Sequence, residues 1–131
     1  MNSIIPYLSE RELKKVIATA ITYITTMSYD KMTAILYFFY YTGIDKQAIL
    51  KITRKEIKES KRQNKFFYSK KVQMVLNQYF RSEPEQNNAF NLTERTLRTL
   101  FENIKRYSNI RAEVNVFKRS YEVNKERRNQ W

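Results

Sequence analysis

The chain has 131 residues, and its 25 Lys and Arg outnumber its 13 Asp and Glu, which gives a formal net charge of +12. It contains no cysteine and no histidine, so thiol catalysis, disulfides and zinc sites built from these residues are excluded, and we expect neither a metal nor a cofactor. This length predicts a single domain over residues 1–131. The positive charge favours a polyanion such as nucleic acid as the partner; the alternative is a basic composition that merely reflects an AT-rich genome.

The first predicted helix begins at Ser9, because Ser9 and Glu12 have the spacing of a capping box, and it extends to about Met27. A second helix follows over residues 32–41, where nearly every residue is apolar or aromatic, so we expect it to be buried. Its length of about ten residues is far below the roughly 20 needed to cross a bilayer, so we expect no membrane partner. The first residues lack the pattern of a signal peptide, so we expect a cytoplasmic, nucleoid-associated location, or the cytoplasm or nucleus of a host cell if the protein is viral.

A sharp corner is predicted at Gly43, the only glycine in the sequence. Glycine just past the end of a helix enters the left-handed region without strain, which allows the chain to reverse. A short helix follows, with Ile44, Ile49 and Ile52 on its apolar side. Its other face is basic and carries Lys46, Lys51, Arg54 and Lys55.

The sequence after Ile57 becomes strongly charged and then aromatic. A charged run from Lys58 to Lys65 is followed by three aromatic residues at positions 66–68. We interpret this stretch as a β-hairpin, with strands near residues 55–60 and 64–68 around a polar turn. The alternative is a solvated loop between two helices.

The second half of the chain predicts three more helices. The first spans residues 69–80, the second begins at Thr93 and ends near residue 109, and the third spans roughly residues 115–129. A polar loop over residues 82–89 separates the first of these helices from the second. The expected fold is therefore mainly α with a small β-hairpin or sheet.

Two stretches of the sequence resemble the catalytic domain of tyrosine recombinases, the phage integrase family. Residues 42–57, TGIDKQAILKITRKEI, match without a gap the family pattern T-G-L-R-x-S-E-L-L-x-L-x-x-x-D-I. Residues 114–123, VNVFKRSYEV, resemble the family's later H-x-x-R-H motif with the Ser or Thr and the aromatic residue that follow it. The resemblance extends from Tyr7 to Val123 and implies a helical recombinase-like fold with a small sheet.

The resemblance assigns the family's catalytic positions to residues that depart from its pattern. The first arginine falls on Asp45, and the second falls on Lys118. The lysine that the family carries on its hairpin corresponds to Lys65, with Lys61 as the alternative. The two histidines of the later motif fall on Asn115 and Arg119.

These departures imply a domain that does not cleave DNA. An acid at Asp45 would repel the phosphate that the family's arginine stabilises, and losing such a group removes roughly 3–4 kcal/mol of transition-state stabilisation. The sequence ends at Trp131, before the position of the family's nucleophilic tyrosine, so we expect no catalytic residue. The favoured interpretation is a DNA-binding regulator or recombination accessory of a phage or mobile element. The alternatives are a fragment of an active recombinase and a basic helical module for protein interaction.

The candidate DNA contacts are basic residues of the corner helix, the predicted hairpin and the later helices. They are Lys51, Arg54, Lys55, Lys58, Lys61, Arg62, Lys65, Lys70, Lys71, Arg95, Arg98, Lys118 and Arg119. Such side chains supply affinity for phosphate rather than sequence reading, although Arg95 and Arg98 would suit guanine contacts if bases are read. Double-stranded DNA is the expected partner, with a second copy of the chain or a full-length recombinase as further candidates.

Overall fold

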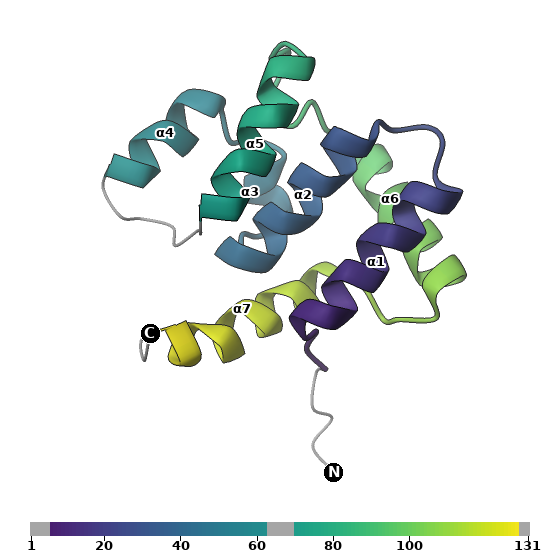
Figure 1. The fold of residues 1–131 in the computed structure, drawn as a ribbon. Coiled ribbons are helices and arrows are strands. Elements are labelled where there is room, and N and C mark those ends of the chain that lie inside the picture. Colours follow the sequence, from purple (N-terminus) through teal and green to yellow (C-terminus); the bar gives the residue numbers. More distant parts are fainter. Residues whose placement is uncertain (1–5, 63–69, 129–131) are drawn as a thin grey trace.

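The computed structural model describes residues 6–62 and 70–128, apart from the side chains of residues 61, 62 and 126–128. Within these ranges the protein consists of seven helices and no strand (Figure 1). They are α1 (Glu10–Tyr23), α2 (Tyr29–Thr42), α3 (Lys46–Ile49), α4 (Arg54–Arg62), α5 (Lys70–Ser82), α6 (Glu94–Ser108) and α7 (Val114–Arg128). The expectation of a mainly helical protein is confirmed. None of the described helices combines the length and the apolar character needed to cross a membrane.

Helix α2 is the centre of the core, as its apolar sequence predicts. It packs against α1, α5 and α7, and it crosses the middle of the molecule in Figure 1. Its residues 32–40 are all buried. Phe39 lies 5.5 Å from Phe101 of α6 and 6.1 Å from Phe117 of α7 between ring centroids. These edge-on and tilted ring contacts join the two C-terminal helices to α2.

The predicted helix start at Ser9 is confirmed. The Ser9 hydroxyl accepts a hydrogen bond from the backbone N–H of Glu12, and the Glu12 carboxylate accepts one from the backbone N–H of Ser9. Helix α1 ends at Tyr23, earlier than the predicted Met27. The Thr93 cap of α6 is also confirmed, because its hydroxyl accepts from the backbone N–H of Thr96.

The corner after α2 also forms at Gly43, which adopts a left-handed conformation with φ of 66° and ψ of 22°. A second constraint comes from α7. A Cβ atom at this position would lie 2.6 Å from Cδ1 of Tyr121, closer than real carbon atoms approach one another. Glycine is therefore required both by the backbone conformation and by the close approach of α7.

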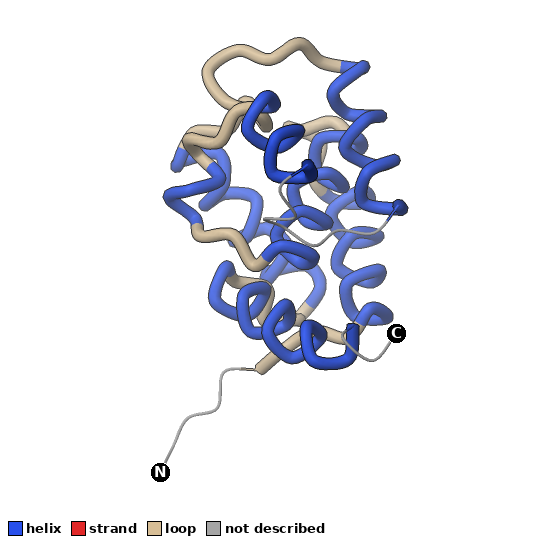
Figure 2. Tube along the Cα trace, turned by 90° about the vertical axis from the view of Figure 1, so that its left-hand side faces the viewer, coloured by secondary structure: helices blue, strands red, loops and turns tan. Residues whose placement is uncertain are grey.

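The first strand of the predicted hairpin is wrong, because residues 55–60 lie within helix α4. The cause is a second capping box, between Thr53 and Glu56. The Thr53 hydroxyl accepts from the backbone N–H of Glu56 at 3.1 Å, and the Glu56 carboxylate accepts from the backbone N–H of Thr53 at 3.0 Å. Ile57 and Ser60, three residues apart, then form the buried side of the helix. The second predicted strand, 64–68, lies outside the described residues, and the described trace in Figure 2 contains helices and loops only.

A buried hydrogen-bond network fixes α7 against α2 and against the segment before α1. The backbone N–H of Leu8 donates to Oγ of Ser120 at 2.7 Å, and the carbonyl of Leu8 accepts from the Tyr40 hydroxyl at 3.0 Å. The amide of Asn124 donates to the same Tyr40 hydroxyl at 2.9 Å. These bonds hold the middle of α7 beside the corner at Gly43, and thereby position Lys118.

Candidate nucleic-acid interface

Helix α3 is the element that joins the sides of the candidate interface. Asp45, just before α3, accepts from Nζ of Lys118 on α7 at 2.5 Å. Lys46, the first residue of α3, lies 3.2 Å from the carboxylate of Glu94 at the start of α6. Two adjacent residues of opposite charge therefore hold this four-residue helix from two sides.

Asp45 and Lys118 are the two positions that the recombinase resemblance assigned to phosphate-binding arginines. They are 73 residues apart in the sequence, and they form a direct ion pair. Both side chains remain open to solvent, with 66% of Asp45 and 38% of Lys118 exposed. Of the other assigned positions, Asn115 is exposed in the first turn of α7, and Arg119 lies 3.7 Å from Glu122 on the same helix. Lys65 lies outside the described residues.

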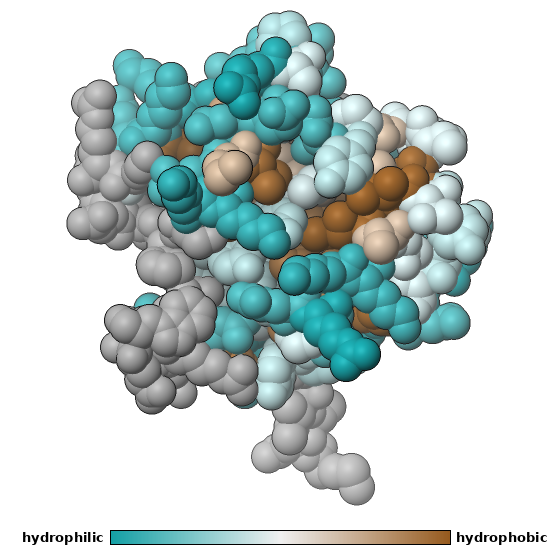
Figure 3. Space-filling view, in the orientation of Figure 1, coloured by the Kyte–Doolittle hydropathy of each residue, from teal (hydrophilic) through white to brown (hydrophobic). Residues whose placement is uncertain are grey.

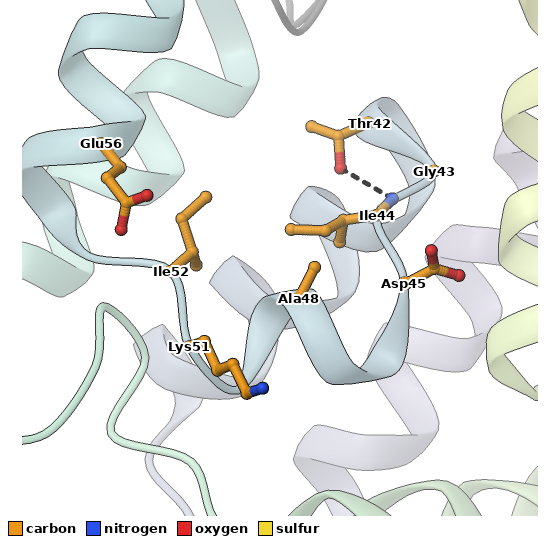
Figure 4. A pocket seen from close by; sticks show the side chains of 8 residues that line it. All are labelled: Thr42, Gly43, Ile44, Asp45, Ala48, Lys51, Ile52 and Glu56. Atoms are coloured by element: carbon orange, nitrogen blue, oxygen red, sulfur yellow. Dashed lines mark hydrogen bonds between the residues drawn. The ribbon is translucent and has the colours of Figure 1, made fainter.

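A pocket of about 470 Å³ opens beside this ion pair, between the end of α2, α3 and the start of α4. Figure 4 shows Asp45 at one end of its lining, Glu56 at the other and Lys51 at the rim. The remaining lining is formed by Thr42, Gly43, Ile44, Ala48 and Ile52. The Glu56 carboxylate is engaged by the cap of α4, and the Asp45 carboxylate is engaged by Lys118. Lys51 is the charged lining residue whose side chain forms neither a hydrogen bond nor an ion pair with the described part of the chain.

Three lysines on the α4 side are exposed and unpaired within the described part of the chain. Lys51, Lys55 and Lys58, here called the lysine cluster, are exposed, and their ammonium groups form no ion pair or hydrogen bond with other described residues. Lys55 and Lys58 are three residues apart in α4 and therefore lie on neighbouring parts of one helix face. Figure 3 shows a hydrophilic surface over α4, whereas the apolar strip on this side of the molecule lies over α1 and α2. The side chains of Lys61 and Arg62 lie outside the described part of the structure.

Arg54 differs from these lysines because its side chain turns inward. Its Nε donates to the carbonyl of Ala89 at 3.1 Å and its Nη1 donates to the carbonyl of Phe80 at 3.3 Å. The guanidinium carbon lies 4.4 Å from the centroid of the Phe80 ring, and Nη2 is buried without a hydrogen-bond partner. Arg54 thus binds the end of α5 and the loop after it to the start of α4, and its guanidinium group is already engaged within the fold.

The remaining candidates lie on α5 and α6. Lys70 and Lys71 are exposed at the start of α5, and Nζ of Lys71 lies 5.5 Å from the centroid of the Tyr37 ring. Arg98 lies 3.7 Å from Glu94, the same carboxylate that pairs with Lys46, so the start of α6 is brought against α3. Arg95 is exposed and has no ion pair among the described residues.

A polar cluster around Asn91 and Glu83 was not predicted from the sequence. Asn91 has a left-handed φ of 49° and donates to the Glu83 carboxylate at 2.6 Å, while Nζ of Lys31 donates to the Asn91 carbonyl at 2.9 Å. Burial alone would raise the pKa of Glu83, but hydrogen bonds from Asn91 and Tyr79 and the charges of Lys31 and Arg54 hold that pKa below its usual value. The signal in the sequence is the presence of three asparagines in the polar loop after Pro84, at positions 87, 88 and 91, since asparagine tolerates the left-handed region.

Chemically, this arrangement offers exposed ammonium groups that can bind an anion such as phosphate. Among the described residues no group of three or more acidic side chains could hold a metal ion. No protein-family model matches the sequence, and comparisons with curated proteins and with solved structures find no significant match.

Proposed function

We propose that this protein binds double-stranded DNA through the surface formed by α3, α4 and α7, and that it does not cleave the strand. The observation that carries this proposal is the lysine cluster, three exposed ammonium groups without partners among the described residues. One of them, Lys51, lines the same pocket as Asp45. Ammonium groups that are free in the unbound protein release condensed counterions when they contact phosphates. The net charge of +12 adds long-range attraction to the duplex.

The resemblance to tyrosine recombinases supports the second half of the proposal. The positions that match the family's two arginines hold an ion pair, Asp45 with Lys118, rather than two cations. A carboxylate there disfavours the charge that develops on a phosphate during cleavage. Helix α4 departs from the sheet that the family carries at this point, so the proposal of DNA binding depends on the lysine cluster rather than on the resemblance.

The test is equilibrium binding of a fluorescent duplex as a function of salt. Changing Lys51, Lys55 and Lys58 together to Gln should reduce the slope of log affinity against log salt by about 2.7, since each lost phosphate contact removes about 0.9. The matched control changes Arg11, Lys14 and Lys15 to Gln. These three residues are exposed on α1 and have no ion pair among the described residues, and α1 lies across α2 from α4 in Figure 1. Both variants lose the same net charge.

Equal losses in the two variants would refute the assigned surface, because net charge alone would then explain them. Weak binding that does not respond to salt would refute DNA binding and favour the helical interaction module instead. The absence of cleavage is tested with a suicide substrate that traps covalent intermediates. A covalent protein–DNA adduct would contradict that part of the proposal.

A further inference from the structure

Asp45 uses its carboxylate in a way that its position in the fold does not require. An Asp at the residue before a helix ordinarily accepts hydrogen bonds from the first free backbone N–H groups. Asp45 occupies that position before α3 but forms no such bond. Its Oδ1 instead accepts from Nζ of Lys118, on a different helix. The carboxylate thus serves Lys118 rather than the start of its own helix.

Lys118 differs from the lysine cluster because its ammonium group already has a carboxylate partner. The lysine cluster has no carboxylate partner among the described residues, whereas Lys118 has one at 2.5 Å. Since both members of the pair are exposed to solvent, the attraction between them is weakened by water and by salt. A phosphate oxygen that approaches Lys118 therefore meets a competitor that is bound loosely enough to be displaced.

We propose, on the basis of the DNA binding proposed above, that Asp45 competes with a DNA phosphate for Lys118 and so removes one contact from the interface. Asp45 acts as a residue that limits affinity. The native protein then binds through the lysine cluster, and Lys118 joins the contact only when the Asp45 carboxylate is displaced or neutralised. The competition concerns phosphate alone, so it changes affinity for all duplexes equally and changes sequence preference for none.

Asp45→Asn is the direct test, since it keeps the size of the side chain and removes its charge. It frees Lys118 for one additional phosphate, so the slope of log affinity against log salt should steepen by about 0.9. Between about 50 and 200 mM salt, the variant should lose about 3.5-fold more affinity than the native protein loses. Adding Lys118→Gln to this variant should remove the gain, and Lys118→Gln alone should leave the slope unchanged.

Glu59→Gln is the matched control for the lost negative charge. Glu59 is exposed on α4, close in sequence to Lys58, and forms no ion pair or hydrogen bond with other described residues. Glu59→Gln changes the net charge as Asp45→Asn does but frees no cation of the described structure. The expected result is a slope like that of the native protein. Thermal unfolding of every variant shows whether each one is folded.

The outcomes separate the inference from the function on which it rests. If the native protein binds DNA with strong salt dependence, but Asp45→Asn and Glu59→Gln behave alike, only the inference is overturned. The inference alone is also overturned if the steeper salt dependence survives when Lys118→Gln is added to Asp45→Asn, because Lys118 is then not the source of the extra contact. If neither the native protein nor Asp45→Asn binds any duplex, the proposed function is overturned together with the inference.

Discussion

Two neighbouring regions of this protein use cationic side chains in opposite ways. In the region around the loop between α5 and α6, Arg54 and Lys31 point inward and donate to the carbonyl groups of Phe80, Ala89 and Asn91. On the α3–α4 side, the lysine cluster points outward and has no partner among the described residues. Arg54 and Lys55 are adjacent in the sequence, yet each belongs to a different region.

The difference shows that the positive side chains behind the net charge of +12 have at least two different roles. An inward cation satisfies buried acceptors, so its removal should lower stability. An outward cation without a partner among the described residues satisfies no buried acceptor, so its removal should change the proposed binding and leave stability almost unaltered. Substitutions in the two regions should therefore separate folding from DNA affinity.

The largest expected effect on stability comes from Arg54→Ala. This change leaves two partly buried carbonyl groups without their donor and removes the contact with the Phe80 ring. We expect the free energy of unfolding to fall by about 3 kcal/mol, as for the loss of hydrogen bonds from a charged group. Urea unfolding followed by circular dichroism measures it. Lys55→Ala is the control and should change that free energy by less than about 0.5 kcal/mol; equal losses at the two positions would abolish the distinction.

Local sequence patterns predicted part of the fold. The capping box of Ser9 and Glu12 and the corner at Gly43 are local signals, and both form as predicted. The same local signal exists at Thr53 and Glu56, where the aromatic residues 66–68 and the recombinase resemblance favoured a strand instead. The helix-start pattern of a few adjacent residues was therefore a better guide there than the resemblance.

Long-range features could not be obtained from local patterns. The inward turn of Arg54 depends on where the carbonyl groups of residues 80 and 89 lie after α5 has packed on α2. The pair of Asp45 and Lys118 joins two helices across 73 residues. No local pattern at either residue indicates this contact.

The next largest effect concerns acid stability and Glu83. Because the pKa of this carboxyl is lower in the folded protein than its usual value of 4.5, the folded state binds fewer protons there than the unfolded state. The stabilisation is therefore present above about pH 4.5 and is lost as the pH falls through the folded pKa. Glu83→Gln should make the free energy of unfolding less dependent on pH in this range.

The control for this prediction is Glu102→Gln. Glu102 is exposed on α6 and forms no ion pair or hydrogen bond with other described residues. Chemical unfolding at a series of pH values below neutrality provides the comparison. An unchanged pH dependence in Glu83→Gln, or an equal change in Glu102→Gln, would show that the cluster around Asn91 does not couple protonation to folding.

The smallest effect on stability should come from the lysine cluster itself. Changing Lys51, Lys55 and Lys58 to Gln removes exposed charges of one sign, two of them three residues apart in α4, so no favourable contact within the described structure is lost. We expect the free energy of unfolding to change by less than about 0.5 kcal/mol, and to rise rather than fall at low salt as repulsion is relieved. The triple variant should also lose affinity for DNA. Arg54→Lys should keep that affinity under conditions in which it is folded. A triple variant that unfolds much more easily would mean that these lysines support the fold, and the contrast between the inward and outward cations would then be wrong.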